Sequence, residues 1–388
     1  MSRDTDRILT THVGSLVRPA KLVEYIDAME RGLAVNQAAF DELLQRSIDE
    51  VVRRQQQAGI NIVSDGEFGK FRSWNFYVLA RLGGIEEREI IESQGGSRDR
   101  QLFPEFYAEY FPTQKLPKRG TVFTVGPVKY TGHAALRKDI EIFKKSLKGV
   151  DVEGFLPVVA PASAVPMFKN EYYKNEEEAI FAVAEALREE YKTIVDSGLY
   201  VQIDDAFLPY VYDLLFGSSN LEGFRKWAQV RVDALNHALE GIPEEKVRYH
   251  ICWGSFNTPH IGDVPLRDIV DLVTQVKAGA YCIEMGNPRH EHEWRVWETA
   301  KLPAGRKLIP GVISHSTNVV EHPELVAERL VRLAKIVGRE NVIGGTDCGF
   351  AQSPHVRRVH PTIQWAKLEA LAEGARIASR ELWGRKAA

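Results

Sequence analysis

The sequence predicts a single (β/α)8 barrel, also called a TIM barrel, in which parallel strands alternate with helices around a closed ring. Three observations lead to this prediction. Short apolar runs recur along the chain and are typical of buried parallel strands. Amphipathic stretches with helical spacing lie between most of these runs. Polar residues gather where the apolar runs end, which is where a barrel presents its functional side chains.

Eight apolar runs are expected to form the barrel strands. In chain order they are residues 60–63, 122–128, 155–160, 200–203, 247–252, 280–285, 308–313 and 342–345. Helical spacing is clear between Phe40 and Val52 and again between Ala179 and Ile194. A doubly wound sheet is the rival fold. No Gly-x-Gly-x-x-Gly motif follows the first run, which removes the main argument for a dinucleotide-binding sheet.

Two regions fall outside the alternation. Residues 84–120 are charged and carry no clean period, so we expect a long excursion after the first strand. It is either a lid over the barrel mouth or a surface loop with a helical turn. The segment 10–19 contains a Gly14-Ser15 turn that could present backbone N–H groups to an anion. Without repeats or an interdomain linker, residues 1–388 are predicted to form one domain.

Composition excludes several classes of function. The chain has 388 residues, 44% of them hydrophobic, and a formal net charge of −3. It therefore lacks the basic field that binds nucleic acid or anionic lipid, and no membrane-spanning run occurs. The three cysteines are too few and too scattered for a disulfide framework, and no apolar leader opens the chain. We expect a cytoplasmic protein.

Metal ligands end three of the expected strands. His250 and Cys252 lie at positions i and i+2 of one strand and share a face. Glu284 ends the next strand, and Cys348 follows the last one. Cysteine, histidine and carboxylate are ligands of zinc, and the carboxyl ends of barrel strands converge on one rim. We predict a zinc site there. Cys282 shares a strand face with Glu284, and spacing alone does not decide between them.

Other polar residues also follow strand ends. Asp65 and Glu67 come after the first run, and Asp204 and Asp205 after the fourth. His315 follows the seventh run and Asp347 the eighth. His290 and His292, which stand among acidic residues, are interpreted as the solvated start of a helix. Trp74 and Trp253 lie near these motifs and are expected to pack in the interior.

The ordered motifs make the chain similar to a known family. They are Thr-Thr-His-Val-Gly-Ser15, Ser-Asp-Gly-Glu67-Phe, Gln-Ile-Asp204-Asp205-Ala, His250-Ile-Cys252, Ile-Glu284, Pro-Gly-Val-Ile313 and Asp347-Cys348-Gly. They extend from about residue 9 to residue 350. The chain resembles the catalytic barrel of cobalamin-independent methionine synthase and its shorter relatives, which include the epoxyalkane:coenzyme M transferases.

The resemblance implies a role for each matching residue. The metal ligands would be His250, Cys252, Glu284 and Cys348, which favours Glu284 over Cys282. Glu67 and Asp204 would hold the amino group of homocysteine, and the backbone around Ser15 would receive its carboxylate. The family's proton-relay histidine falls at Ser316, so whether His315 points inward stays open. Ala160-Pro-Ala-Ser163 and Asp205-Ala206 also depart from the family pattern.

Three functions follow as hypotheses. The first is a zinc-dependent methyl transferase in which a metal-bound thiolate, most simply homocysteine, attacks a methyl donor such as a methylfolate or a methylcorrinoid. In that reaction His315 or Asp347 would protonate the leaving group. The second is conjugation of a sulfonate thiol with an epoxide, for which Arg18, Lys70 and Arg72 could supply cations. The third is a non-catalytic barrel with a structural zinc.

Overall fold

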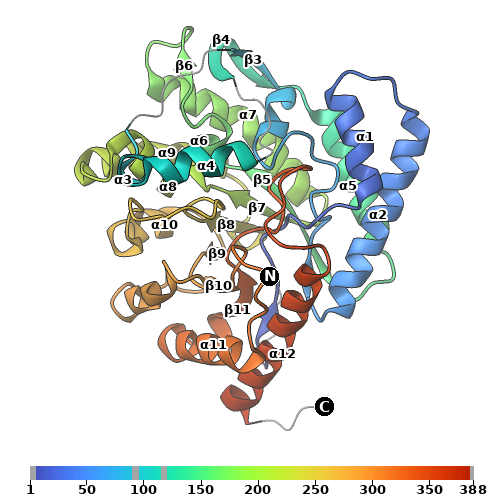
Figure 1. The fold of residues 1–388 in the computed structure, drawn as a ribbon, viewed down its shortest axis with the longest axis vertical. Coiled ribbons are helices and arrows are strands. Elements are labelled where there is room, and N and C mark those ends of the chain that lie inside the picture. The colour runs from blue at the N-terminus through green and yellow to red at the C-terminus, as the bar shows by residue number, and fades with distance from the viewer. Residues whose placement is uncertain (1–5, 90–95, 115–119, 385–388) are drawn as a thin grey trace.

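A closed ring of parallel strands forms the centre of the computed structural model, which describes residues 6–89, 96–114 and 120–384. The strand order is β1-β11-β10-β9-β8-β7-β5-β2. Thr11 pairs with Ile62, so the two ends of this sheet meet and the barrel closes (Figure 1). The strands are β1 (Leu9–Thr10), β2 (Ile62–Val63), β5 (Glu153–Val159), β7 (Tyr200–Asp204), β8 (Val247–Ile251), β9 (Ala280–Ile283), β10 (Lys307–Ile313) and β11 (Ile343–Thr346). The predicted barrel is confirmed.

Helices surround the barrel and shield its strands from solvent (Figure 1). The longer ones are α1 (Ala20–Glu30), α2 (Gln37–Gln57), α5 (His133–Leu147), α7 (Glu176–Asp196), α8 (Phe207–Phe216), α9 (Leu221–Ala238), α11 (Pro323–Val337) and α12 (Ile363–Trp383). Shorter ones are α6 (Pro161–Ala164) and α10 (Val270–Gln275). The predicted helical periods lie in α2 and α7, whose buried faces include Phe40 and Ala179. Asn36 and Asn175 cap these helices by accepting backbone N–H groups.

The membership of the barrel differs from the prediction at one strand. Residues 122–128 belong to β4 (Thr121–Tyr130), which pairs with β3 (Leu82–Arg88) and β6 (Lys169–Asn170) in a separate three-stranded sheet. Figure 1 shows this sheet outside the ring. The missing barrel strand is β1, which overlaps the start of the segment 10–19 that was expected to lie outside the alternation. Accordingly, the long excursion follows the second barrel strand, not the first.

The excursion itself is largely structured. Its described part contains β3, α3 (Arg98–Leu102) and α4 (Pro104–Thr113), while residues 90–95 and 115–119 of the predicted lid lie outside the described residues. Asp213 of α8 accepts hydrogen bonds from the Ser97 hydroxyl and from the Arg98 N–H at 2.9 Å. Asp99 accepts one from the Gly262 N–H at 2.9 Å. These bonds attach α3 to the barrel wall.

The lower barrel interior is filled by side chains. Residues from seven of the eight barrel strands form one buried cluster: Leu9, Ile62, Phe155, Tyr200, Ala280, Cys282, Ile309 and Ile343. The remaining strand, β8, contributes Arg248, whose guanidinium lies 3.8 Å from the centre of the Phe155 ring. The barrel is therefore packed below, and a ligand can enter only at its carboxyl rim. That residues 1–388 form one domain stays a prediction.

None of the helices in the described ranges has the length and apolar character needed to cross a bilayer.

Candidate metal centre and active site

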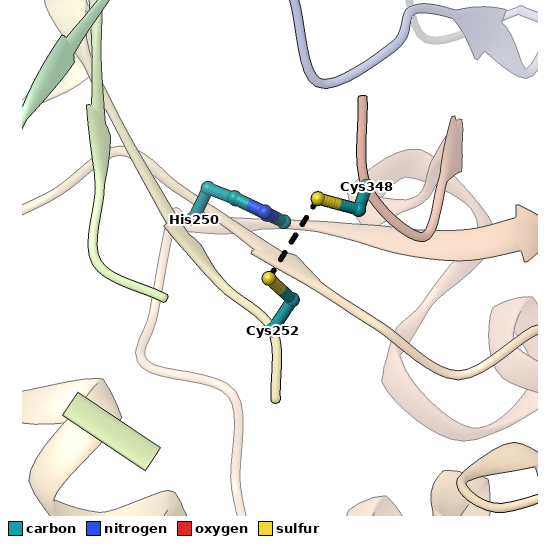
Figure 2. A group of neighbouring side chains, drawn as sticks. All are labelled: His250, Cys252 and Cys348. Carbon is teal, nitrogen blue, oxygen red and sulfur yellow. Dashed lines mark hydrogen bonds between the residues drawn. The ribbon is translucent and has the colours of Figure 1, made fainter. Parts of the chain in front are cut away.

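Three of the predicted metal ligands meet at the carboxyl rim. His250 lies in β8, Cys252 follows its end, and Cys348 follows β11. One ligand atom from each lies within 4.8 Å of the others. Figure 2 shows the three side chains pointing toward one another from these two segments. This is the spacing that a single metal ion would need to contact all three.

The imidazole of His250 is oriented for metal binding. Its Nδ1 lies 3.3 Å from the carbonyl oxygen of Cys282, so Nδ1 carries the proton and donates it. Its Nε2 is buried and has no hydrogen-bond partner. Burial lowers the pKa of this imidazole, which keeps it neutral. A buried, unpaired nitrogen lone pair beside two sulfur atoms fits a metal ligand.

A hydrogen bond joins the two thiols of the cluster. The Sγ atoms of Cys252 and Cys348 lie 3.7 Å apart, with Cys252 as the donor. This hydrogen bond lowers the pKa of Cys348 and raises the pKa of Cys252. Two sulfur atoms at this distance, each free of other side-chain ligands, are suited to converge on one soft cation.

Glu284 lies close to this cluster but belongs to a second group. Its carboxylate, the His315 imidazole and the Asp347 carboxylate lie within 4.8 Å of one another. Glu284 Oε2 accepts the Trp253 N–H at 2.9 Å, and Oε1 accepts the Asn287 amide at 2.5 Å. Burial raises the pKa of Glu284 to about 7. Its assignment as fourth ligand stays a prediction.

Cys282 is engaged elsewhere. Its sulfur lies 3.8 Å from Gln202 Oε1 and 3.8 Å from the Arg248 guanidinium, in the packed interior. It belongs to neither group of potential metal ligands found among the described residues. Neither Cys282 nor Glu284 belongs to the group formed by His250, Cys252 and Cys348, so the choice of Glu284 over Cys282 stays a prediction.

A cavity of about 760 Å³ opens above His250, Cys252 and Cys348. The predicted substrate residues Ser15, Glu67 and Asp204 also line it. The structure thus brings the three ligands and the three substrate residues to one chamber, as strand-end convergence predicted. Burial raises the pKa of Asp204 to about 7, which shows how little water reaches this part of the chamber.

Backbone geometry fixes Ser15 and Glu67 in this chamber. Glu67 has a positive φ of 61°, a strained conformation for a residue with a side chain. Its N–H donates to Asp65 at 2.9 Å, and its carboxylate pairs with Lys70 at 3.3 Å. A Cβ at Gly349 would lie 1.9 Å from the Ser15 hydroxyl, so a glycine is required where Ser15 meets the segment after Cys348.

The predicted proton donors lie behind the metal cluster. His315 and Asp347 are buried and are absent from the described lining of the cavity. Asp347 Oδ1 accepts the N–H groups of Met285 and Gly286 at 3.0 and 2.6 Å. Burial lowers the pKa of His315 to about 3 and raises that of Asp347 to about 8. His315 does point inward, but toward Glu284.

A sequence model of the cobalamin-independent synthase catalytic domain matches residues 137–366, more than half of the chain. The chain belongs to this family. The methionine synthase of Sulfolobus acidocaldarius is 24% identical over 385 residues, covering 98% of this chain and 95% of its own. The 2-hydroxypropyl-CoM lyase of Xanthobacter autotrophicus is 25% identical over 375 residues, covering 88% of each chain.

A solved structure confirms the fold of this chain. The B12-independent methionine synthase from Shewanella sp. W3-18-1, in complex with selenomethionine, aligns with a TM-score of 0.72 at 20% sequence identity. The alignment covers 98% of this chain and 100% of that one. The recognised resemblance and the prediction of an enzyme of the methyltransferase type are confirmed at the level of the family.

The sequence analysis did not predict the apolar part of the cavity lining. Phe207, Tyr210, Leu214 and Leu215 of α8 line the cavity together with the predicted polar residues. A signal was present, because Phe207–Phe216 is apolar on almost every side, although one face of a surface helix should be polar.

A buried network behind Cys252 was also missed, and the expectation for His290 was wrong. His290 is only 4% exposed and stacks on Trp253, with ring centroids 4.1 Å apart. It lies 2.9 Å from carboxylate oxygens of both Asp263 and Glu293, which raise its pKa to about 10 against the effect of burial. Glu293 lies three residues further along the same segment, but Asp263 and Trp253 come from elsewhere in the chain, so the local sequence did not predict that His290 is buried.

Proposed function

We propose that the protein is a zinc-dependent alkyl transferase that moves a methyl group onto a small thiol, with homocysteine as the acceptor. One observation carries this proposal. His250, Cys252 and Cys348 converge at the floor of a cavity that Glu67 and Asp204 also line. Relatives named methionine synthase, at 22–24% identity over most of the chain, support the choice of acceptor.

The donor set fits zinc. One imidazole nitrogen and two cysteine sulfurs are typical zinc ligands, and we propose Glu284 as the fourth. Trp253 and Asn287 hold the Glu284 carboxylate through hydrogen bonds, as residues around a metal commonly do. When bound, zinc would lower the pKa of a coordinated thiol so that its sulfur is a nucleophile at neutral pH.

The remaining residues bind and orient the amino acid. We propose that Glu67 and Asp204 pair with the ammonium group, because both carboxylates face the cavity beside the ligand cluster. The backbone at Ser15 would receive the carboxylate. The roles of His315 and Asp347 in proton transfer stay predictions, since neither is among the described residues that line the cavity.

A second candidate is conjugation of a sulfonate thiol, favoured by the similarity to 2-hydroxypropyl-CoM lyase. It would need a cation at the head group of the thiol. Lys70 pairs with Glu67, and Arg18 donates to the carbonyl oxygen of Glu67. Neither cation is among the described residues lining the cavity, whereas both carboxylates are. This arrangement favours an amino-acid thiol over a sulfonate.

The test is the visible spectrum of the Co(II)-substituted protein during titration with homocysteine, coenzyme M and glutathione. We expect sulfur-to-cobalt charge-transfer bands that grow with homocysteine. Growth with coenzyme M alone would establish the second candidate. Bands that no thiol changes would identify a closed structural metal and overturn the proposal.

A further inference from the structure

The cavity above the candidate metal centre is lined by two unlike sets of residues. The polar set consists of the strand-end residues already described. The second set comes from Trp74, from α4 and α8, from the loop after β8 and from residues 165–168. The volume of about 760 Å³ lies in the upper part of the roughly 300–1,000 Å³ range of small-molecule sites. It can hold a second substrate beside the thiol.

Aromatic rings dominate the second set of residues that line the cavity. Trp74 stacks on Phe207, with centroids 6.2 Å apart and an interplanar angle of 21°. Phe207 meets Tyr210 edge to face at 5.9 Å, and Phe111 meets Phe256 in the same way at 5.8 Å. All five residues line the cavity. Such a wall offers both ring faces and ring edges to a flat, uncharged ligand.

The entrance next to these residues is apolar as well. Met167 and Leu215 line the cavity, and they are 36% and 50% exposed. Exposed apolar side chains at the rim of a cavity are unfavourable in water unless a ligand or partner uses them. Here they continue the apolar wall outward to solvent. An apolar ligand that enters along these side chains gives up few hydrogen bonds to water, so its desolvation costs little free energy.

The charges on the described lining do not favour an anion against this wall. Arg358 lies over the Phe256 ring, 4.8 Å from its centroid, and hydrogen-bonds to Ser255 and Gln114. Arg100 lies 4.9 Å from the centroid of Phe111. Both guanidinium groups are thus packed on the wall's own rings. The two carboxylates, Glu67 and Asp204, are assigned to the ammonium group of the acceptor and offer no positive charge to an anionic donor.

We propose that the alkyl donor is an uncharged aromatic compound whose electrophilic carbon is bonded to oxygen, and that the Trp74–Phe207 wall binds its ring. Aryl methyl ethers and aryl epoxides share this chemistry. The proposal rests on the proposed function, because it names the second substrate of the same site. A donor bound on this wall occupies the same cavity as Cys252 and Cys348, where the acceptor sulfur would be held.

The step balances without any further reactant. The acceptor sulfur forms a bond to the carbon, and the carbon–oxygen bond breaks. The oxygen keeps the electron pair, and the proton that the thiol lost ends on that oxygen. An aryl methyl ether thereby gives a methyl thioether and a phenol, and an epoxide gives a hydroxyalkyl thioether. No oxidation or reduction takes place.

The first experiment measures binding, without a thiol and without turnover. Propylbenzene, an unreactive analogue of these donors, is titrated into the full-length zinc-loaded protein by calorimetry, with 5-methyltetrahydrofolate titrated in parallel. We expect the arene to bind and the folate to bind more weakly. Leu215→Lys should weaken arene binding about tenfold by placing a charge at the apolar entrance. Leu325→Lys, at an exposed leucine of α11 that is absent from the described cavity lining, should leave it unchanged.

Phe207→Ala provides a second test from inside the wall, with a thermal melt to establish that the variant folds. We expect a loss of arene affinity at least as large as that of Leu215→Lys. Absence of arene binding in the wild type, tighter binding of the folate, or unchanged affinity in both variants would overturn the proposal. The Co(II) titration measures binding of the acceptor thiol. It would therefore show that the assignment of homocysteine is wrong independently of the result for the donor.

Turnover distinguishes the two donor types. Homocysteine is incubated with anisole or with styrene oxide, and the thioether products are identified by mass spectrometry. Transfer from either compound, reduced about tenfold in Leu215→Lys, supports the proposal. If the arene binds but neither compound reacts while 5-methyltetrahydrofolate does, the donor assignment is wrong.

Discussion

The three cysteines of the chain differ in what their sulfur atoms touch. Cys252 and Cys348 lie 3.7 Å apart beside the unpaired Nε2 of His250, whereas Cys282 contacts Gln202 and Arg248. We therefore expect Cys348→Ser to lower zinc affinity by more than about a hundredfold, because hydroxyl is a poor ligand for zinc. Metal content after dialysis, measured by mass spectrometry, checks this.

Cys282→Ser is the matched control for that experiment. It removes a buried thiol of the same size from the same barrel but outside the ligand cluster, so zinc content should equal that of the wild type. Full zinc occupancy in Cys348→Ser, or equal losses in both variants, would contradict the assignment.

Glu67 allows the acceptor to be tested apart from the metal. Its carboxylate lines the cavity, and its positive φ shows that the fold holds it there at a cost of about 1–3 kcal/mol. Glu67→Gln keeps the shape of the side chain and removes the charge. Homocysteine should bind roughly 10- to 100-fold more weakly, since a hydrogen bond to a charged group is lost. Zinc content should not change.

Calorimetry with homocysteine and coenzyme M measures the effect of Glu67→Gln. Coenzyme M has no ammonium group, so its affinity should stay the same or increase. Unchanged homocysteine affinity would instead favour the sulfonate-thiol candidate.

A site residue could be predicted from the sequence when its neighbours lie at other strand ends, and it could not when its neighbours come from loops. Strand ends converge by topology, so His250, Cys252, Cys348, Asp204 and Glu67 could be placed together from the sequence. The sequence could not decide between Cys282 and Glu284 as the metal ligand. The two residues share a strand face and differ only in depth within the barrel, because two residues along a strand move a side chain by roughly 7 Å. The wall at Phe207 and the stack of His290 on Trp253 depend on loops that pack from elsewhere.

At the scale of elements, prediction failed at one short barrel strand and at one strand outside the barrel. β1 has only two residues, too few for a period, and was missed. β2 is equally short, but the apolar run 60–63 predicted it correctly. β4 is long and rich in valine, and for this reason the sequence predicts its residues 122–128 as a barrel strand. Its burial falls off along its length, with Val125 40% exposed, as expected of an antiparallel strand with one face toward water. Barrel strands such as β7 are buried throughout.

The segment containing α3 and α4 offers a prediction at the same scale. Asp213 of α8 accepts hydrogen bonds from Ser97, Arg98 and Ser218, and it is 5% exposed. Asp213→Ala removes these bonds, each contributing about 1 kcal/mol. Residues 96–114 should then exchange amide hydrogens at least about tenfold faster, while the barrel helices keep their rates. Hydrogen exchange with mass spectrometry resolves the two regions.

Asp233→Ala on α9 is the control, because Asp233 is exposed and hydrogen-bonds only within its own helix to Gln229 among the interactions described. If residues 96–114 exchange alike in the wild type and in Asp213→Ala, Asp213 does not hold this segment. Whether the segment acts as a lid would then have to be decided from other contacts, such as that of Gln114 with Arg358.

The stability of the whole molecule depends on a buried histidine at the point where the barrel closes. His12 follows β1, its Nε2 lies 2.6 Å from Gln55 Oε1 of α2, and its Nδ1 accepts the Gly14 N–H at 3.2 Å. Both nitrogens are satisfied by the neutral ring. Burial lowers the pKa of His12 from 6.5 to about 4, and nearby Arg248 acts in the same direction.

The sign of the resulting pH dependence follows from proton uptake. Between about pH 6.5 and pH 4 the unfolded chain binds a proton at His12 and the folded chain does not, so acid favours unfolding. Buried carboxyl groups with raised pKa, such as Asp65 and Asp205 at about 6, act with the opposite sign. The contribution of His12 is therefore visible only as a difference between two proteins that share those carboxyl groups.

His12→Gln supplies that difference, because glutamine keeps a polar side chain beside Gln55 but does not titrate. The variant should be less stable than the wild type at pH 7.5. The gap in free energy of unfolding should then shrink by up to about 3 kcal/mol as the pH falls to 4, the amount that corresponds to the shift in pKa. Urea unfolding at several pH values measures it. A gap that stays constant across this range would mean that His12 has the same pKa in the folded and the unfolded chain, and the hydrogen bonds that close the ring would have to be reassigned.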